Sequence, residues 1–208
     1  MDLYKKYHVS IGSNIGDRLE NIQSSLDLIH SRIASLTGIS CIYESESIGF
    51  DGDDFYNICA SFFSNISPHL VMQQLLEIEK TLGRNRSDET KYISRIIDID
   101  ILLIEDLVID SEELKVPHPE MCNRRFVMEP LIEIDPNLIH PVSKVSLKEI
   151  YEAFDQSQKI QKKDLVLNKP GDLLSIRNYN YIAIEGNIGS GKTSLSKQIS
   201  ADFNTKLM

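Results

Sequence analysis

The sequence predicts an α+β fold, in which an antiparallel sheet carries helices on one face and an incomplete strand–loop–helix tail follows. Two observations lead to this fold class. Predicted elements follow the order β-α-β-β-α-β over residues 7–104, which is the split βαβ or ferredoxin-like arrangement. Near the C-terminus, a further strand and a glycine-rich loop begin a second pattern. The length of 208 residues suits one domain and a smaller addition.

The first strand and helix are predicted from residues 7–36. Residues 7–11 are expected to form a strand that ends at a glycine-containing turn over residues 12–16. Asp17 is placed to cap the helix that follows. Apolar residues then recur at steps of three and four, which predicts an amphipathic helix; they are Leu19, Ile22, Leu26, Ile29, Ile33 and Leu36.

The remaining elements of the sheet domain follow the same reasoning. Strands are predicted over residues 39–47, 55–63 and 97–104, and Ser67-Pro68 signals a helix that ends at Gly83. The apolar face of that helix is Val71, Leu75, Ile78 and Leu82. After a tight connection at Glu105-Asp106, the expected elements are an extended segment over residues 116–119 and helices over residues 125–134 and 147–154.

The composition excludes several classes of protein. Lys and Arg number 22 against 31 Asp and Glu, a net charge of −9, which is opposite to the basic surface of a nucleic-acid binder. Apolar residues nowhere run for the roughly 20 positions that a membrane span needs. The three cysteines lack a paired or zinc-binding spacing, so we expect reduced thiols. A cytoplasmic, monomeric protein without nucleic-acid or membrane partners is expected.

Asp98 and Asp100 form the first candidate site. They alternate with isoleucines on a predicted strand, so Ile97, Ile99, Ile101 and Leu103 are expected to face the helices while both carboxylates share the opposite face. Adjacent carboxylates repel each other, and a divalent cation such as Mg²⁺ would relieve the repulsion. The alternative is a strand face with two solvated aspartates.

Cationic and aromatic residues form the second set of candidates. Arginines grip phosphates with two parallel hydrogen bonds, and the candidate cations are Arg84, Arg86, Lys91, Arg95, Arg124 and Arg125. A solvated run of charges is the alternative. His118 lies between two prolines on a rigid segment. Its side chain is either placed to donate a hydrogen bond to a phosphate or has a purely structural role. Phe55 and Phe126 either stack on a flat heterocycle or belong to the core.

These residues and their order resemble the family of 6-hydroxymethyl-7,8-dihydropterin pyrophosphokinases of folate biosynthesis. The matching stretches are GSNIGDRLENI at residues 12–22, FYN at 55–57, EKTLGR at 79–84, SRIIDIDILL at 94–103, VPHPEM at 116–121 and NRRFVMEPLIEI at 123–134. The resemblance implies a ferredoxin-like fold and the transfer of a pyrophosphoryl group from ATP to the hydroxymethyl group of the pterin, with release of AMP.

The resemblance also implies roles for individual residues. Asp98 and Asp100 would hold two Mg²⁺ ions. The triphosphate of ATP would lie near Glu79, Arg84, Arg95, His118 and Arg124, while Arg86 would belong to a mobile loop that closes over it. Arg84, Arg86, Arg95, Asp98 and Asp100 would form the catalytic set. The pterin would be bound by Ser45, Ile48, Phe55, Asn57 and Phe126.

Two segments depart from the family pattern. Many members carry Trp-x-Pro before the arginine of the Asp-x-Asp strand, whereas this chain has Tyr92, Ile93 and Ser94 there. The segment from Ser45 to Ser47 also lacks the usual prolines. We expect these differences to change rates of loop closure and leave the reaction type unchanged.

The C-terminal tail carries a P-loop pattern. Gly186, Gly191, Lys192 and Thr193 fit G-x-x-x-x-G-K-[ST], with a predicted strand at residues 181–185 before it and a helix at residues 194–200 after it. The string YIAIEGNIGSGKTSL resembles the start of a deoxynucleoside kinase. We expect residues 1–158 to form the pterin domain, residues 159–178 a linker, and residues 179–208 an inert, poorly ordered start of a second kinase that stops at Met208.

Two alternatives to the pyrophosphokinase hypothesis stay open at this point. In the first, the domain is a nucleotide-binding or assembly module that has lost turnover. In the second, the complete gene encodes a bifunctional enzyme with deoxynucleoside kinase activity. The retained Asp98, Asp100, Arg84, Arg95 and His118 argue against loss of turnover, and the missing prolines argue weakly for it.

Overall fold

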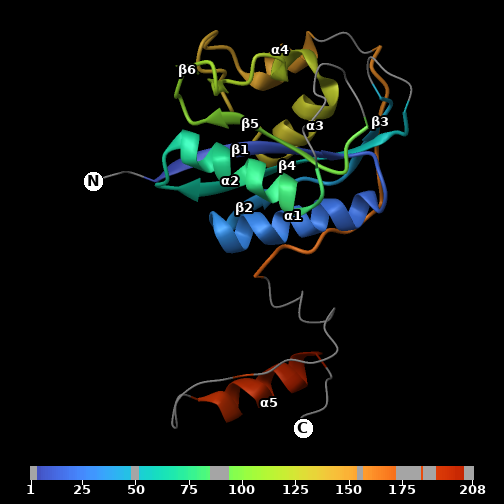
Figure 1. Cartoon of the computed structure of the whole chain (residues 1–208), viewed down its shortest axis with the longest axis vertical. Coiled ribbons are helices and arrows are strands. Elements are labelled where there is room, and N and C mark those ends of the chain that lie inside the picture. Colours follow the sequence, from blue (N-terminus) through green and yellow to red (C-terminus); the bar gives the residue numbers. More distant parts are fainter. Residues whose placement is uncertain are drawn as a thin grey trace. The chain divides into compact units, whose positions relative to one another are not determined.

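The structure is a computed structural model that describes residues 4–47, 52–84, 94–153, 157–171, 184 and 191–203. The chain divides into two compact units, Met1–Pro170 and Gly171–Met208. The first unit contains a sheet between two layers of helices (Figure 1). Each unit is described by itself.

An antiparallel sheet forms the centre of the first unit. Its strand order is β5-β1-β4-β3-β8, and β2 pairs with the remaining part of β4. The strands are β1 (Lys5–Ser13), β2 (Leu36–Ile39), β3 (Tyr43–Ser45), β4 (Phe55–Ser64), β5 (Asp98–Ile104) and β8 (Ile160–Lys162). The strand predicted over residues 39–47 is therefore two short strands, β2 and β3, that both pair with β4.

Two helices cover one face of this sheet: α1 (Arg18–Arg32) and α2 (Pro68–Thr81). The apolar face of each packs with Tyr7, Val9 and Ile11 of β1 in one buried cluster. The Asp17 side chain accepts the Glu20 amide hydrogen and caps α1, as predicted. Leu36 is an exception to the predicted helix, because the helix ends at Arg32 and Leu36 begins β2.

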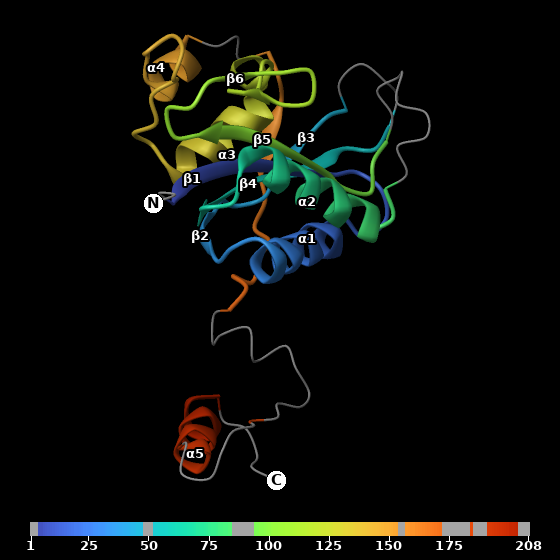
Figure 2. The same ribbon diagram turned by 60° about the vertical axis from the view of Figure 1, so that its left-hand side comes forward.

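The opposite face of the sheet is also covered, and this corrects the expectation of helices on one face alone. Helix α3 (Arg125–Ile134), with the bounds predicted, packs against β4 together with the 3₁₀ turn η1 (Met121–Asn123) and α4 (Leu147–Glu152). Their apolar side chains form a second buried cluster around Cys59, Leu102 and Leu131. Figure 2 shows α3 and α4 on the side of the sheet away from α1 and α2.

An irregularity in β5 decides which side chains reach which face. The register of β5 against β1 shifts between His8 and Val9, so that β5 has one extra residue there. Ile99 and Ile101 lie in the cluster with α1 and α2, whereas Leu103 lies in the cluster with α3. The prediction that Leu103 shares a face with the isoleucines is therefore wrong, because strict alternation stops at the bulge.

The segment that follows α4 belongs to the first unit. Strand β8 pairs with β3 inside the region predicted to be a linker, and the compact unit continues to Pro170. The linker expectation for residues 159–170 is thus corrected. A small hairpin of β6 (Ile109–Asp110) and β7 (Lys115–Val116) completes the unit.

The second unit contains helix α5 (Lys192–Phe203), which begins at the P-loop lysine and includes the helix predicted after the motif. Gly191 precedes it with a φ of 81°, a conformation that favours glycine. A regular helix here differs from the poor order expected for the tail. Gly186 and most of the predicted strand over residues 181–185 lie outside the described residues. In the described part of the chain, no helix has the length and apolarity to cross a membrane.

Candidate active site

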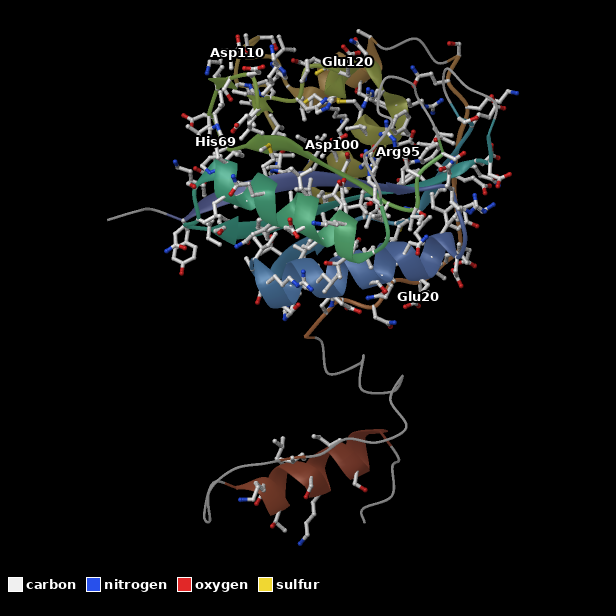
Figure 3. All side chains as sticks on the ribbon, in the orientation of Figure 1. Glu20, His69, Arg95, Asp100, Asp110 and Glu120 are labelled. Atoms are coloured by element: carbon white, nitrogen blue, oxygen red, sulfur yellow. The ribbon has the colours of Figure 1, made fainter. Side chains whose placement is uncertain are left out.

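A cavity of about 300 Å³ lies against the sheet face that α3 covers, at one end of the strands. Residues of β1, β3, β4 and β5 form its floor, and the turn before α3 forms one wall. Figure 3 labels three of the lining residues: Arg95, Asp100 and Glu120. Of the predicted site residues, the cavity brings together Ser45, Phe55, Asn57, Arg95, Asp98, Asp100, Arg124 and Phe126. These eight residues come from four separate parts of the chain, at residues 45, 55–57, 95–100 and 124–126, and meet in one place.

Asp98 lies at the start of β5, opposite Gly12 of β1. Its two carboxylate oxygens form ion pairs with Arg84 and with Arg95. Desolvation raises the pKa of the Asp98 carboxyl, but the two guanidinium groups outweigh this effect and hold the pKa below its ordinary value. Asp98 is therefore ionised at neutral pH.

Asp100 has the opposite electrostatic environment. Desolvation and the nearby charge of Asp98 raise the pKa of its carboxyl, and the positive charges around the cavity only partly oppose them. The Nε2 atom of His118 lies 3.9 Å from a carboxylate oxygen of Asp100. Asp98 and Asp100 therefore line the same cavity, as alternation along the strand predicts.

His118 is held in one orientation. Its Nδ1 accepts a hydrogen bond from the Glu120 amide at 3.2 Å, and its own amide donates to the Leu102 carbonyl at 2.9 Å. Desolvation lowers the pKa of the imidazole despite the opposing charge of Asp100, so the ring is neutral at pH 7. With Nδ1 as the acceptor, the proton is on Nε2, the atom that faces Asp100.

The residues present fit a magnesium site. Mg²⁺ takes one or two carboxylates and completes its coordination with water and substrate phosphates. Asp98 and Asp100 supply such a pair. Desolvation and the charge of Asp98 raise the pKa of Asp100, and a cation would favour its ionised form. Within the described residues, no group of three or more His, Cys, Asp and Glu side chains gathers.

Glu79 and Arg84 lie behind the carboxylates and do not line the cavity. Glu79 is 1% exposed, and one of its oxygens accepts hydrogen bonds at 2.7 Å from Arg84 and from the Ile99 amide. Because Arg84 also pairs with Asp98, the buried carboxylate holds the guanidinium and the start of β5 together. The structure thus places Glu79 one contact away from the cavity.

The other end of the cavity is aromatic and amide-rich. Asn57 is 5% exposed and its Nδ2 donates to Ser45 Oγ at 3.0 Å, while Phe55 and Phe126 line the same space. A Cβ atom on Gly12 would lie 3.2 Å from Asn57 Oδ1. Glycine at position 12 therefore keeps the space beside the Asn57 carbonyl oxygen open.

Sequence reasoning missed several cavity residues. Ser10, Gly12, Glu46, Glu120, Asn123 and Gln158 also line it. Alternation along β1 predicts that Ser10 and Gly12 share a face, whereas no local pattern marks Gln158. Several predicted positions lie outside the described residues: Ile48, Arg86, Lys91, Tyr92 and Ile93. Arg125 pairs with Glu129 and does not line the cavity.

Comparison with known proteins connects this cavity to a family. Residues 8–136 match the family model described as 7,8-dihydro-6-hydroxymethylpterin-pyrophosphokinase. A 2-amino-4-hydroxy-6-hydroxymethyldihydropteridine pyrophosphokinase from Aquifex aeolicus is 37% identical over 143 residues, which cover 68% of this chain and 88% of the relative. The protein of the same name from Bacillus subtilis is 37% identical over 61% of this chain and 76% of its own length.

Longer proteins contain a similar region. The folic acid synthesis protein fol1 from Pneumocystis carinii is 34% identical over 70% of this chain, which spans 20% of that protein. A crystal structure of Plasmodium falciparum HPPK-DHPS superimposes with a TM-score of 0.59 at 14% identity; it covers 73% of this chain, and the match spans 44% of the solved chain. This structural likeness shows a shared fold. Together with the sequence matches, it shows that the chain belongs to the 7,8-dihydro-6-hydroxymethylpterin-pyrophosphokinase family.

Proposed function

We propose that the cavity catalyses the reaction of this family with the flat pterin at its aromatic end and the phosphates of ATP at its carboxylate end. The chain is an ATP-dependent diphosphotransferase of folate biosynthesis, which transfers pyrophosphate from ATP to 6-hydroxymethyl-7,8-dihydropterin and forms AMP. The observation that carries the proposal is that one cavity joins two phenylalanines and a buried amide to two carboxylates and two arginines.

At the aromatic end, Phe55 and Phe126 are placed to sandwich the pterin ring. Asn57 offers a carbonyl oxygen and an amide to its polar edge, and its bond to Ser45 restricts the amide to one orientation. We also propose that backbone groups around Ile48 bind the polar edge of the pterin. An aromatic sandwich with a buried amide selects for a flat ring with hydrogen-bonding edges.

At the carboxylate end, Asp98 and Asp100 would hold Mg²⁺, with two ions as the number that we propose. When bound, the metal neutralises phosphate charge and lowers the pKa of the attacking hydroxyl group. Arg95 and Arg124 line the cavity and would contact phosphate oxygens, while Arg84 would act from behind Asp98, with which it pairs. The neutral His118 would donate a hydrogen bond from its Nε2–H group to a phosphate oxygen.

The reaction needs no nucleophilic side chain. The hydroxymethyl oxygen attacks the β-phosphorus, a new P–O bond forms, and the bond from that phosphorus to the oxygen of the α-phosphate breaks, so AMP leaves and the hydroxyl proton is released. Arg95 and Arg124 stabilise the charge that shifts onto the leaving oxygen, and the aromatic end fixes the attacking atom. Positioning and electrostatic stabilisation account for catalysis of such transfers.

For the tail, we propose a P-loop motif that has no activity of its own. Its support is the motif ending at Lys192 and Thr193 and the helix that begins there. Gly186 and Gly191 would belong to the phosphate-binding loop. We also propose that the enzyme is monomeric and cytoplasmic and acts on small molecules. The net charge of −9 argues against a nucleic-acid partner.

A product assay tests the main proposal. The protein is incubated with ATP, Mg²⁺ and 6-hydroxymethyl-7,8-dihydropterin, and the nucleotides are separated by chromatography. We expect AMP to form only when the pterin is present. ATP binding without AMP formation would favour a binding module that lacks turnover. Replacement of the pterin by deoxynucleosides should give no ADP, and ADP formation would contradict the assignment of the tail.

A further inference from the structure

The segment after α4 contributes to the cavity although it lies beyond the residues that the family model matches, which end at 136. We call residues 157–170 the C-terminal strap. Its Gln158 lines the cavity, and its strand β8 pairs with β3. The strap therefore touches two walls of the site.

Gln158 forms three hydrogen bonds with the turn that leads into α3. Its Oε1 accepts from the Arg125 amide at 2.9 Å, and its Nε2 donates to the Asn123 carbonyl at 3.0 Å. Its own carbonyl accepts from Arg125 Nη1 at 3.1 Å. The three bonds bracket Arg124, whose side chain lines the cavity.

The bond to the Arg125 amide replaces a missing helix cap. The first amides of a helix lack partners within the helix, and a side chain at the N-cap position usually accepts from one of them. Arg124 occupies the N-cap of α3 and makes no such bond. Gln158, 33 residues away in sequence, accepts from the first amide of the helix instead. The next residue of the helix is Phe126, which lines the cavity.

The same strap supports the opposite wall. Ile160 pairs with Ser45, and the Lys163 amide donates to the Ile42 carbonyl at 2.8 Å. At its far end, the strap is anchored by Leu165 and Leu167, which pack against the core, and by Asn168. The Asn168 backbone exchanges two hydrogen bonds with the Gln23 side chain, at 2.8 and 3.0 Å.

We propose that Gln158 is a positioning residue for pterin binding: it fixes the turn at residues 123–125 so that Phe126 and Arg124 keep their places in the cavity. The proposal rests on the proposed function, since it assumes that the pterin binds beside Phe126. Gln158 acts through these neighbours. Its loss should therefore weaken binding of the pterin more than the chemical step or the binding of ATP.

Steady-state kinetics of Gln158→Ala test the proposal. We expect the KM for the pterin to rise about tenfold, the change that corresponds to about 1.4 kcal/mol, because two side-chain hydrogen bonds to the turn are lost. The kcat and the KM for ATP should change less than the KM for the pterin. The turn holds Arg124, one of the cations proposed for the phosphates, whereas the aspartates and Arg95 keep their contacts. Gln158→Glu retains the acceptor for the Arg125 amide and should recover part of the pterin affinity.

Gln23→Ala is the matched control, because it also removes two hydrogen bonds between a glutamine side chain and backbone groups, here at the far anchor of the strap. Gln23 does not line the cavity. We expect this variant to keep the wild-type KM for the pterin, even if thermal unfolding shows a small loss of stability. Equal increases of KM in both variants would mean a general loosening of the strap and would overturn the proposal.

Other outcomes separate this proposal from the function on which it rests. An unchanged KM for the pterin in Gln158→Ala, with normal wild-type turnover, overturns the positioning role and leaves the function intact. Absence of AMP formation by the wild-type protein rejects the proposed function itself. If Gln158→Ala does not fold, Gln158→Leu, which keeps the side-chain volume, is used with the same expected KM and the same criterion for rejection.

Discussion

At the scale of single residues, Asp98 and Asp100 differ in their surroundings although they are two positions apart on one strand. Asp98 is paired with Arg84 and Arg95, which hold its pKa down, whereas Asp100 has a raised pKa because of desolvation and the charge of Asp98. The cavity therefore contains one carboxylate that is firmly ionised and one that would gain most from a cation. This asymmetry follows from the placement of two arginines.

Replacement of Asp98 by alanine should lower kcat by about a hundredfold or more, as for other losses of a group that organises charge in a transition state. The variant also leaves Arg84 and Arg95 without the carboxylate that they share. The measurement is AMP formation at saturating substrates. Asp110→Ala is the matched control, since Asp110 pairs with Lys115 on the surface and should leave kcat unchanged. Wild-type kcat in Asp98→Ala would refute the metal-binding role.

Gly12 offers a steric test of the pterin position. A Cβ at this residue would lie 3.2 Å from Asn57 Oδ1 and 3.6 Å from a Phe55 ring carbon. Overpacking of this kind costs about 1–3 kcal/mol, so Gly12→Ala should raise the KM for the pterin about tenfold while the KM for ATP changes little. A selective rise in the KM for ATP would place the pterin elsewhere.

His8 should make the folded state less stable in acid. It is 1% exposed, and desolvation and the charge of Lys6 lower its pKa from 6.5 to about 4, although Asp135 opposes them. Between these pH values the unfolded chain binds a proton that the folded chain rejects. The free energy of unfolding should therefore fall as pH drops from 6.5 to 4, by up to about 3 kcal/mol.

Chemical denaturation across this pH range measures the effect. His8→Gln cannot titrate at this position, so its free energy of unfolding should depend less on pH than that of the wild type. His69→Gln is the control, because His69 lies exposed near the start of α2 (Figure 3) and should leave the pH dependence unaltered. Identical pH dependence in the wild type and His8→Gln would contradict the role of His8.

At the scale of elements, the site depends on where strands and helices begin. Asp98 opens β5, Ser45 ends β3, Phe55 opens β4, and Phe126 lies in the first turn of α3. At the ends of helices and strands, side chains and amides can face a ligand, while the rest of each element holds its end in position. The bulge in β5 lies beyond Asp100, so the two aspartates keep regular alternation.

The cap of α1 gives a prediction at this scale. Asp17 accepts the Glu20 amide hydrogen at 3.1 Å, so Asp17→Ala should lower the free energy of unfolding by about 1 kcal/mol. Urea unfolding provides the measurement. Asp27→Ala, an exposed carboxylate within the same helix, should change it by less than about 0.5 kcal/mol. Equal losses in both variants would mean that general charge effects, and not the cap, are responsible.

At the scale of the whole molecule, the chain consists of two compact units, Met1–Pro170 and Gly171–Met208. Every described residue of the cavity belongs to the first unit. The strap closes this unit, because it adds β8 to the sheet and anchors Asn168 on α1 through Gln23. The first unit thus contains the parts that the proposed reaction needs.

A chain that ends at Pro170 should therefore retain the pyrophosphokinase activity of the full chain within about twofold, since no cavity residue is removed. AMP formation and thermal unfolding are measured for both chains. Lys192→Ala in the full chain is the companion variant and should also leave AMP formation unchanged. Loss of activity in either would show that the tail takes part in the reaction.

Much of the fold follows from local patterns in the sequence. The periodicity of apolar residues predicts α1 and α2, and alternation places Asp98 and Asp100 on one face. The helix predicted over residues 125–134 has the extent of α3. These features depend on neighbouring residues in the chain, which share a helix face or alternate on a strand. The sequence motifs also identify eight of the residues that line the cavity.

The tertiary structure decided the features that depend on distant partners. The bulge that turns Leu103 toward α3 arises from pairing with β1, and the second layer of helices and strand β8 become visible only when the sheet is assembled. Gln158 has no local signal, because its partners at Asn123 and Arg125 are more than 30 residues away. Local sequence determines element type and the regular alternation of side chains, whereas pairing across the sheet determines where that alternation breaks and which residues meet.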